Sequence, residues 1–281
     1  MNKFFIIASL LFLFSCTKNA EEPVIETEAK TLMDVSYGTD TRHKMDIYLP
    51  ANRSTAQTKV LILVHGGGWA GGDKADFNAL LPDIKDAAQG YAIFNITYRL
   101  YADGNNKFPA QEQDIKKAVE FIFSKRTEYA VSDKFVLLGA SAGGHLVQLQ
   151  AYKYNSPVRP KAVVTFFGPT DLTAAYNSNP LGGFLLLFPV LGGTPDQQPD
   201  LYWQSSPLNH ITAQSPPTII LQGGQDPIVS KAQADLLQAK LQSMNVPNQL
   251  VLYPNAGHGW DGEDLKDSFV KISAFLATHV K

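Results

Sequence analysis

The chain has 281 residues, of which 44% are hydrophobic and 18% charged, and its formal net charge is −2. This composition is that of an ordinary globular protein with one large domain or two small ones. Because the near-neutral chain contains no block of basic residues, the sequence excludes nucleic acid as an expected partner.

Residues 1–15 have the pattern of a signal peptide. A polar start with a single lysine precedes the apolar run FFIIASLLFLF, which is too short to span a bilayer as a helix. Cys16 follows directly, and Leu13-Phe14-Ser15-Cys16 resembles a bacterial lipoprotein signal, in which the cysteine becomes the lipid-carrying first residue. Plain secretion is the alternative. Either interpretation predicts an exported protein, and the first predicts a membrane partner through a lipid anchor.

Residues 16–31 are polar and acidic and are expected to form a tether between the anchor and a folded domain at 32–281. Cys16 is the only cysteine of the chain, so no intramolecular disulfide is possible. The hydrophobic core must therefore stabilise the domain without a cross-link.

From residue 32 onward, short apolar runs alternate with helical patterns. The runs are rich in β-branched and aromatic residues, which predicts strands buried on both faces. Helical periodicity is clearest at 109–129, 230–243 and 264–279. This alternation predicts an α/β fold, with a mainly parallel sheet and helices on both faces. The predicted strands are 44–49, 60–64, 92–97, 135–138, 162–167, 218–221 and 249–253.

Residues 172–210 break this rhythm. Asparagine, proline and glycine surround the apolar segment GGFLLLFPVLGG, which is too short to cross a membrane. One interpretation is a core helix. The other is a small cap-like insertion over the carboxyl ends of the strands, where sheets of this type bind their ligands.

The stretch LILVHGGGWAGGD, residues 61–73, places a run of glycines at the end of a predicted strand. Three glycines in a row lose much conformational entropy when they become ordered, so a specific use is expected. The loop is suited either to cradling a phosphate or to aiming backbone N–H groups at a negative charge that develops during a reaction. A tight turn without chemistry is also compatible with this stretch.

The segment FVLLGASAGGHL, residues 135–146, is a predicted strand that runs through G-x-S-x-G into a predicted helix. In this context the serine, Ser141, sits on a strained turn that exposes its Oγ beside the N-terminus of the helix. Its flanking glycines avoid side-chain collisions at the turn. Ser141 is therefore the candidate nucleophile.

HGGGW at 65–69 together with GASAGG at 139–144 resembles the α/β-hydrolase superfamily, in its HGGG-containing lipase and carboxylesterase branch. The resemblance covers essentially residues 32–281. It implies that the backbone N–H groups of Gly67, Gly68 and Ala142 form an oxyanion hole, with Gly66 as an alternative to one of them. The absence of a following GK[ST] motif argues independently against a nucleotide-binding loop.

The order of catalytic groups in this family is serine, acid, histidine. His258 lies in YPNAGHGW, between the last predicted strand and the last helix, where the family has its base. Two aspartates match positions of the acid: Asp226 in LQGGQDPIV matches the usual one, and Asp171 in FFGPTDL a minority arrangement. Each aspartate also has a purely structural interpretation as a helix cap or turn residue. Asp226 is the preferred candidate.

The resemblance implies a serine esterase that works through an acyl-enzyme and requires neither metal nor cofactor. Trp69 and Trp260 flank the predicted site loops, so each either lines a substrate pocket or packs in the core. His145, in the first turns of the helix after Ser141, is expected to be structural. Asp73 and Arg99 are candidates for an ion pair behind the glycine loop.

The compact form of the domain is similar to exported bacterial esterases that act on acylated plant polysaccharides, of the feruloyl and acetyl-xylan type. This resemblance implies short or aromatic acyl esters as substrates. The lipoprotein-like pattern at residues 1–16 predicts a location in the periplasm or on the cell surface. Three alternatives remain: a general small-molecule carboxylesterase or lipase, a peptidase of the prolyl-oligopeptidase type, and a non-catalytic carbohydrate-binding surface lipoprotein. The peptidases share the fold but usually carry a large N-terminal propeller. The binding lipoprotein would be expected to lose a catalytic residue, and the sequence has a candidate for each.

Overall fold

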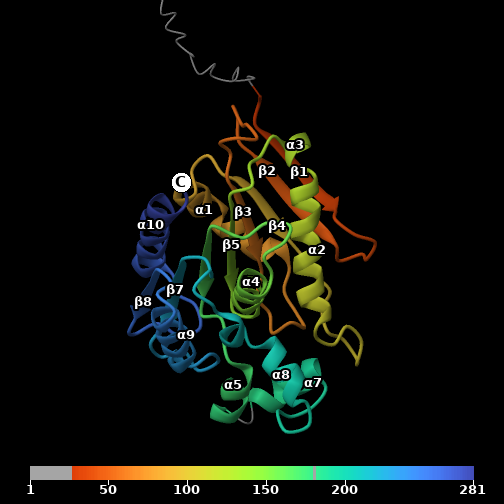
Figure 1. Ribbon diagram of the computed structural model, residues 1–281, viewed down its shortest axis with the longest axis vertical. Coiled ribbons are helices and arrows are strands. Elements are labelled where there is room, and N and C mark those ends of the chain that lie inside the picture. The colour runs from red at the N-terminus through yellow and green to blue at the C-terminus, as the bar shows by residue number, and fades with distance from the viewer. Residues whose placement is uncertain (1–26, 180–181) are drawn as a thin grey trace, which may run out of the picture.

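The computed structural model describes residues 27–179 and 182–281. Within these residues, eight strands form one sheet in the order β1-β2-β4-β3-β5-β6-β7-β8 (Figure 1). β1 and β2 pair antiparallel, as do β2 and β4, and every other neighbouring pair is parallel. The strands are β1 (Lys30–Ser36), β2 (Lys44–Leu49), β3 (Val60–Val64), β4 (Ala92–Ile96), β5 (Phe135–Ala140), β6 (Ala162–Phe166), β7 (Thr218–Gly223) and β8 (Asn248–Tyr253).

The predicted α/β fold with a mainly parallel sheet is confirmed, and each predicted strand is present within one or two residues of its predicted ends. β1 is the strand that the sequence did not predict. It lies at the edge of the sheet and its side chains are mostly exposed, so it lacks the apolar run that marks a buried strand. β1 begins at Lys30, inside the segment expected to be a tether.

Helices cover both faces of the sheet. Alternate residues of each central strand point to opposite faces; in β3, Ile62 belongs to one buried cluster and Leu63 to the other. The cluster around Ile62 also contains side chains of α2 (Ala110–Ser124), α3 (Arg126–Tyr129), α4 (Ala142–Lys153) and α9 (Lys231–Ser243). The cluster around Leu63 contains side chains of η1 (Lys74–Leu80), α1 (Leu81–Ala87) and α10 (Gly262–His279).

The insertion at 172–210 folds into short helices that lie together at one end of the molecule, beyond the sheet (Figure 1). Some of its apolar side chains, such as Leu191 and Tyr202, are buried in the core, while Leu185 and Leu186 are exposed. The segment therefore adds side chains to the hydrophobic core and also forms part of the protein surface. Its elements are α5 (Leu172–Ser178), the π-helical turn η2 (Gly183–Leu187), α7 (Phe188–Leu191), α8 (Pro199–Ser205) and η3 (Pro207–His210).

The predicted signal peptide, Cys16 and most of the predicted tether lie outside the described residues. The described end of the tether is bound to the domain: the carbonyl of Thr27 accepts from Asn52 N at 2.8 Å, and its Oγ1 accepts from Arg53 N at 3.1 Å. Among the residues that the structure describes, none of the helices is both long enough and apolar enough to cross a bilayer.

Candidate active site

Ser141 occupies a strained turn between β5 and α4. Its backbone has φ 54° and ψ −122°, a conformation that side-chain-bearing residues rarely adopt. The glycines on either side leave no room for a side chain: a Cβ on Gly139 would lie 2.3 Å from the carbonyl oxygen of Gly143, and one on Gly143 would lie 2.1 Å from that of Val64. The G-x-S-x-G pattern is therefore dictated by backbone packed against backbone.

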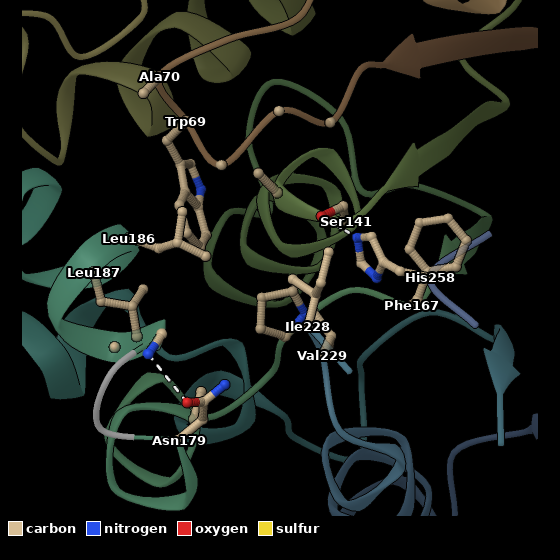
Figure 2. A pocket seen from close by; sticks show the side chains of 18 of the residues that line it. Trp69, Ala70, Ser141, Phe167, Asn179, Leu186, Leu187, Ile228, Val229 and His258 are labelled. Carbon is tan, nitrogen blue, oxygen red and sulfur yellow. Dashed lines mark hydrogen bonds between the residues drawn. The ribbon is translucent and has the colours of Figure 1, made fainter. Parts of the chain in front are cut away.

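A hydrogen-bonded chain connects the candidate nucleophile to a buried carboxylate. His258 Nε2 lies 2.9 Å from Ser141 Oγ (Figure 2). On the other side of the ring, His258 Nδ1 lies 2.7 Å from Asp226 Oδ2. Because an ionised carboxylate only accepts, Nδ1 carries the proton, and Nε2 accepts from the serine hydroxyl. The three residues come from the carboxyl ends of β5, β7 and β8. The structure thus brings together the serine, histidine and preferred aspartate of the sequence analysis.

The Asp226 carboxylate is fully buried and firmly oriented. Its Oδ1 accepts from the backbone amides of Ile228 at 2.8 Å and Val229 at 2.9 Å. Gln222, near the end of β7, donates Nε2 to Val229 O at 3.0 Å and lies 3.4 Å from Asp226 Oδ2. The sequence analysis did not identify Gln222, although a polar residue inside a buried strand was a signal for it.

Asp171, the alternative acid, has a different role in the structure. It is the N-cap of α5, where its Oδ1 accepts from Ala174 N at 2.9 Å. The hydrogen-bond partner of His258 Nδ1 is Asp226. The geometry therefore assigns the capping interpretation to Asp171.

The glycine loop lies beside the serine turn. Gly67 has φ 103°, and a Cβ there would lie 2.2 Å from the carbonyl oxygen of Gly71. The Gly67 carbonyl closes the loop by accepting from the amides of Ala70 at 3.1 Å and Gly71 at 2.8 Å. Within the described residues, the amides of Gly67 and Gly68 have no hydrogen bond to a protein acceptor.

Ala142 is the first residue of α4, so its amide is one of the N–H groups that a helix leaves without an internal partner. Gly67, Gly68 and Ala142 line the same cavity as Ser141 and His258. The predicted donor set is therefore gathered around the serine. The N-terminus of α4 adds a partial positive charge on the same side.

His65 holds the beginning of the glycine loop. Its Nδ1 lies 2.7 Å from the Gly66 carbonyl, and its ring stacks on Tyr98 with centroids 4.3 Å apart. The Tyr98 hydroxyl donates to the His65 carbonyl at 2.9 Å. Burial lowers the pKa of His65 to about 4, so the imidazole is neutral near pH 7. His65 is thus placed to fasten the loop.

The expected ion pair between Asp73 and Arg99 is wrong. Asp73 pairs with Arg42 at 3.0 Å, and Arg99 pairs with the fully buried Asp114 at 2.7 Å. Arg42 lies between β1 and β2, and it also donates to the carbonyl of Gly72 at 2.8 Å. It was missed because the contact joins segments that are distant in the sequence, and β1 was itself not predicted.

An apolar cavity of about 540 Å³ opens above Ser141. The glycine loop contributes Trp69, the insertion contributes Leu186 and Leu187, and the segment after Asp226 contributes Ile228 and Val229 (Figure 2). Ser141 and His258 lie at its base with Phe167 beside them. Among the described residues, no group of three or more histidine, cysteine or acidic side chains is arranged to hold a metal.

Of the two tryptophans proposed for substrate binding, Trp69 lines this cavity and Trp260 does not. Trp260 packs behind Phe167 with ring centroids 5.5 Å apart, and against Tyr253 at 4.7 Å. Its Nε1 donates to Ser268 Oγ at 2.9 Å. Trp260 therefore supports Phe167 rather than forming the cavity surface.

The chain is similar to known proteins in sequence and in fold. It is 28% identical over 244 residues to the esterase LipC of Mycobacterium tuberculosis, covering 81% of this chain but only 59% of that protein. A bifunctional GH43-CE structure from Bacteroides eggerthii aligns with TM-score 0.79 and 26% identity, over 89% of this chain and 38% of the other. The truncated form of a carbohydrate esterase from gut microbiota aligns with TM-score 0.72 and 23% identity, over 90% and 99% of the two chains.

The family assignment rests on a match that covers most of the domain. The sheet, the turn at Ser141 and the structural neighbours identify the fold as that of the α/β-hydrolases. Residues 45–241 match the sequence profile of the BD-FAE family. Because this match spans more than half of the chain, the protein belongs to the BD-FAE family.

Proposed function

We propose that this protein is a serine esterase, which hydrolyses carboxylic esters through an acyl-enzyme on Ser141. The observation that carries the proposal is the hydrogen-bonded chain from Asp226 through His258 to Ser141, which opens into an apolar cavity. Similarity to proteins named esterases supports carboxylic ester hydrolysis as the class of reaction. A non-catalytic binding lipoprotein is disfavoured because it would have no need of this chain of contacts.

In the first half of the reaction, Ser141 Oγ attacks the ester carbonyl carbon while His258 Nε2 takes the hydroxyl proton. The carbonyl oxygen becomes negative and accepts hydrogen bonds from the amides of Gly67, Gly68 and Ala142. The C–O bond to the alcohol then breaks, and His258 gives its proton to the departing oxygen. Asp226 stabilises the imidazolium that exists between these two steps.

The second half repeats these steps with water. His258 removes a proton from a water molecule, whose oxygen attacks the acyl carbon, and the same amides stabilise the second oxyanion. The bond to Ser141 Oγ breaks, the serine regains its proton from His258, and the carboxylic acid leaves. Each amide donor contributes about 3–4 kcal/mol to transition-state stabilisation when measured by deletion.

For the substrate, we propose short-chain or aromatic acyl esters, including those attached to plant polysaccharides. The support is the motif resemblance to exported bacterial esterases of this kind and the moderate cavity of about 540 Å³. Each CH₂ of a long acyl chain adds about 0.8 kcal/mol of binding free energy only if it is buried in an apolar tunnel. We therefore expect little activity on chains beyond about ten carbons. A preference for long-chain triglycerides would favour the lipase alternative.

We also propose that the protein is exported and anchored in a membrane by a lipid on Cys16. The support is the sequence pattern at residues 1–16, which lies outside the described residues. Full-length protein should partition into the detergent phase, and Cys16→Ser should release it. Wild-type protein that is soluble and cleaved at another position would contradict the anchor.

Labelling with a fluorophosphonate tests the catalytic proposal directly. Wild-type protein should become labelled and should hydrolyse p-nitrophenyl acetate, and peptide mapping should locate the label on Ser141. Ser141→Ala should abolish labelling and lower turnover by several orders of magnitude, with an unchanged circular dichroism spectrum. Near-normal turnover in Ser141→Ala would contradict the assignment.

A further inference from the structure

His145 is a fully buried histidine that the proposed mechanism does not use. It lies in the first turns of α4, where its backbone amide donates to the Ser141 carbonyl at 3.0 Å. Its Nδ1 accepts from Trp69 Nε1 at 3.2 Å, and its Nε2 lies 2.7 Å from the Ser205 carbonyl at the end of α8. One imidazole thus connects the nucleophile helix, the glycine loop and the insertion.

These contacts define the chemical state of the His145 ring. An indole N–H only donates and a carbonyl oxygen only accepts, so Nδ1 is bare and Nε2 carries the proton. Burial lowers the pKa of His145 to about 4, which keeps the ring neutral near pH 7. The Trp69 and His145 rings also make a T-shaped edge contact, with an interplanar angle of 87° and centroids 5.2 Å apart. The hydrogen bond and this edge contact together fix the plane of the indole.

Trp69 connects His145 to the cavity, because it is hydrogen-bonded to His145 and lines the cavity. Its backbone has φ 60°, and the residue is only 5% exposed. If Ser141 is the nucleophile, as proposed above, the alcohol must leave within reach of His258 Nε2, beside Phe167. The acyl group then extends toward the other side of the cavity, where Figure 2 shows Trp69 with Leu186 and Leu187.

We propose that His145 is a positioning residue that holds Trp69 as a fixed wall of the acyl side, and that this wall limits the size of the acyl group. The inference rests on the proposed esterase function. It assigns selectivity to a hydrogen bond rather than to the volume of the indole alone. Loss of the bond frees the ring to move, so larger acyl groups are accepted.

Two substitutions of His145 separate its contacts. In His145→Gln, the side-chain amide reaches the position of Nε2, so the bond to the Ser205 carbonyl is retained and the acceptor for Trp69 is lost. In His145→Asn, Oδ1 takes the position of Nδ1, so the acceptor for Trp69 is retained and the Ser205 bond is lost. Trp69→Phe removes the donor while keeping an aromatic ring and an intact His145.

The measurement is kcat/KM for p-nitrophenyl hexanoate divided by kcat/KM for p-nitrophenyl acetate, which share one leaving group. This ratio should rise about tenfold in His145→Gln and in Trp69→Phe, as expected for a change in an apolar pocket. The double variant should show no further rise, and His145→Asn should stay within about twofold of wild type. Exchange protection of the Trp69 indole N–H, followed by NMR, should be lost in His145→Gln and kept in His145→Asn.

The outcomes separate this inference from the function on which it rests. A ratio in Trp69→Phe equal to that of wild type would overturn the inference, as would equal changes in both His145 variants, which indicate a merely structural histidine. If His145→Gln does not fold, Trp69→Phe still tests the inference, because an unchanged ratio in that variant overturns it. Wild-type protein inactive toward both esters overturns the esterase proposal itself, and the acyl-side role of Trp69 with it.

Discussion

Two sides of the cavity are built in different ways. On one side, the glycine loop and the Ser141 turn form a backbone wall, residues 65–72 and 139–143, in which main chain touches main chain. On the other side, residues 172–210 form an insertion wall of apolar side chains, and Leu186 on it is 41% exposed. The backbone wall holds the groups proposed for chemistry and carries Trp69, whose indole joins the insertion wall on the proposed acyl side of the cavity. At Gly67, Gly139 and Gly143 the backbone wall has no space for a side chain, whereas we expect the insertion wall to tolerate substitution.

The largest effect on kcat is expected for Asp226, the aspartate of the hydrogen-bonded chain. Asp171, just before the insertion, serves as the comparison. Asp226→Asn should lower kcat for p-nitrophenyl acetate by about 10⁴, because an amide at this position favours the wrong tautomer of His258. Asp171→Asn should have little effect on kcat, since asparagine is an equally good N-cap for α5. Circular dichroism provides the folding control. A reversed order of the two effects would show that Asp171 is the acid.

The second prediction tests the backbone wall with two glycines of one loop. In Gly67→Ala the new Cβ would lie 2.2 Å from the carbonyl oxygen of Gly71, so the loop must shift and its amide moves out of the oxyanion hole. We expect kcat to fall by about 10²–10³, the loss measured when one oxyanion-hole donor is removed. Gly71→Ala is the matched control, because its Cβ would make an ordinary contact at 3.5 Å with the Gly67 carbonyl oxygen. Similar kinetics for the two variants would refute a wall defined by backbone contact.

The third prediction concerns the neutral histidines: His65 of the backbone wall and His145 between the two walls. Their pKa values are lowered to about 4 by burial, whereas an unfolded histidine has a pKa of about 6.5. The unfolded chain therefore binds more protons between these values, so stability is lost as the pH falls from about 6.5 to 4. Each histidine should contribute about 3 kcal/mol to this loss.

Urea unfolding at pH 7.0 and pH 4.5 measures the effect of the histidines. His145→Asn should reduce the decrease in unfolding free energy between the two pH values, because one buried imidazole has been removed. The decrease in unfolding free energy between the two pH values is determined separately for wild type and for the variant. A loss of stability that the substitution causes at both pH values therefore cancels. An unchanged decrease would mean that His145 becomes protonated without unfolding.

The smallest expected effect belongs to the insertion wall. Leu186→Ala should raise the hexanoate-to-acetate ratio of kcat/KM by about threefold, because it opens the acyl side by a partly exposed side chain. Stability should change by less than about 0.5 kcal/mol. Leu185→Ala is the matched control, since Leu185 is 62% exposed and does not line the cavity. A loss of acetate activity in Leu186→Ala would show that the two walls are not independent.

The sequence alone was sufficient for the features that depend on local backbone geometry. Alternating apolar runs predicted the parallel strands, since a strand buried on both faces must be apolar throughout. The turn at Ser141 was predictable because its conformation admits only glycine at Gly139 and Gly143. His258 followed from the family resemblance, which implies a base in a loop after the last strand. These signals are contained in a few consecutive residues.

Only the tertiary structure decided the features that depend on contacts between distant segments. It selected Asp226 over Asp171, replaced the expected Asp73–Arg99 pair by Arg42 with Asp73, and placed Trp260 behind Phe167. Either aspartate follows a strand and precedes a helix, so the local pattern is the same for both. Which one meets His258 depends on the order of strands in the sheet and on the side from which each loop returns, and no short segment of sequence contains that information.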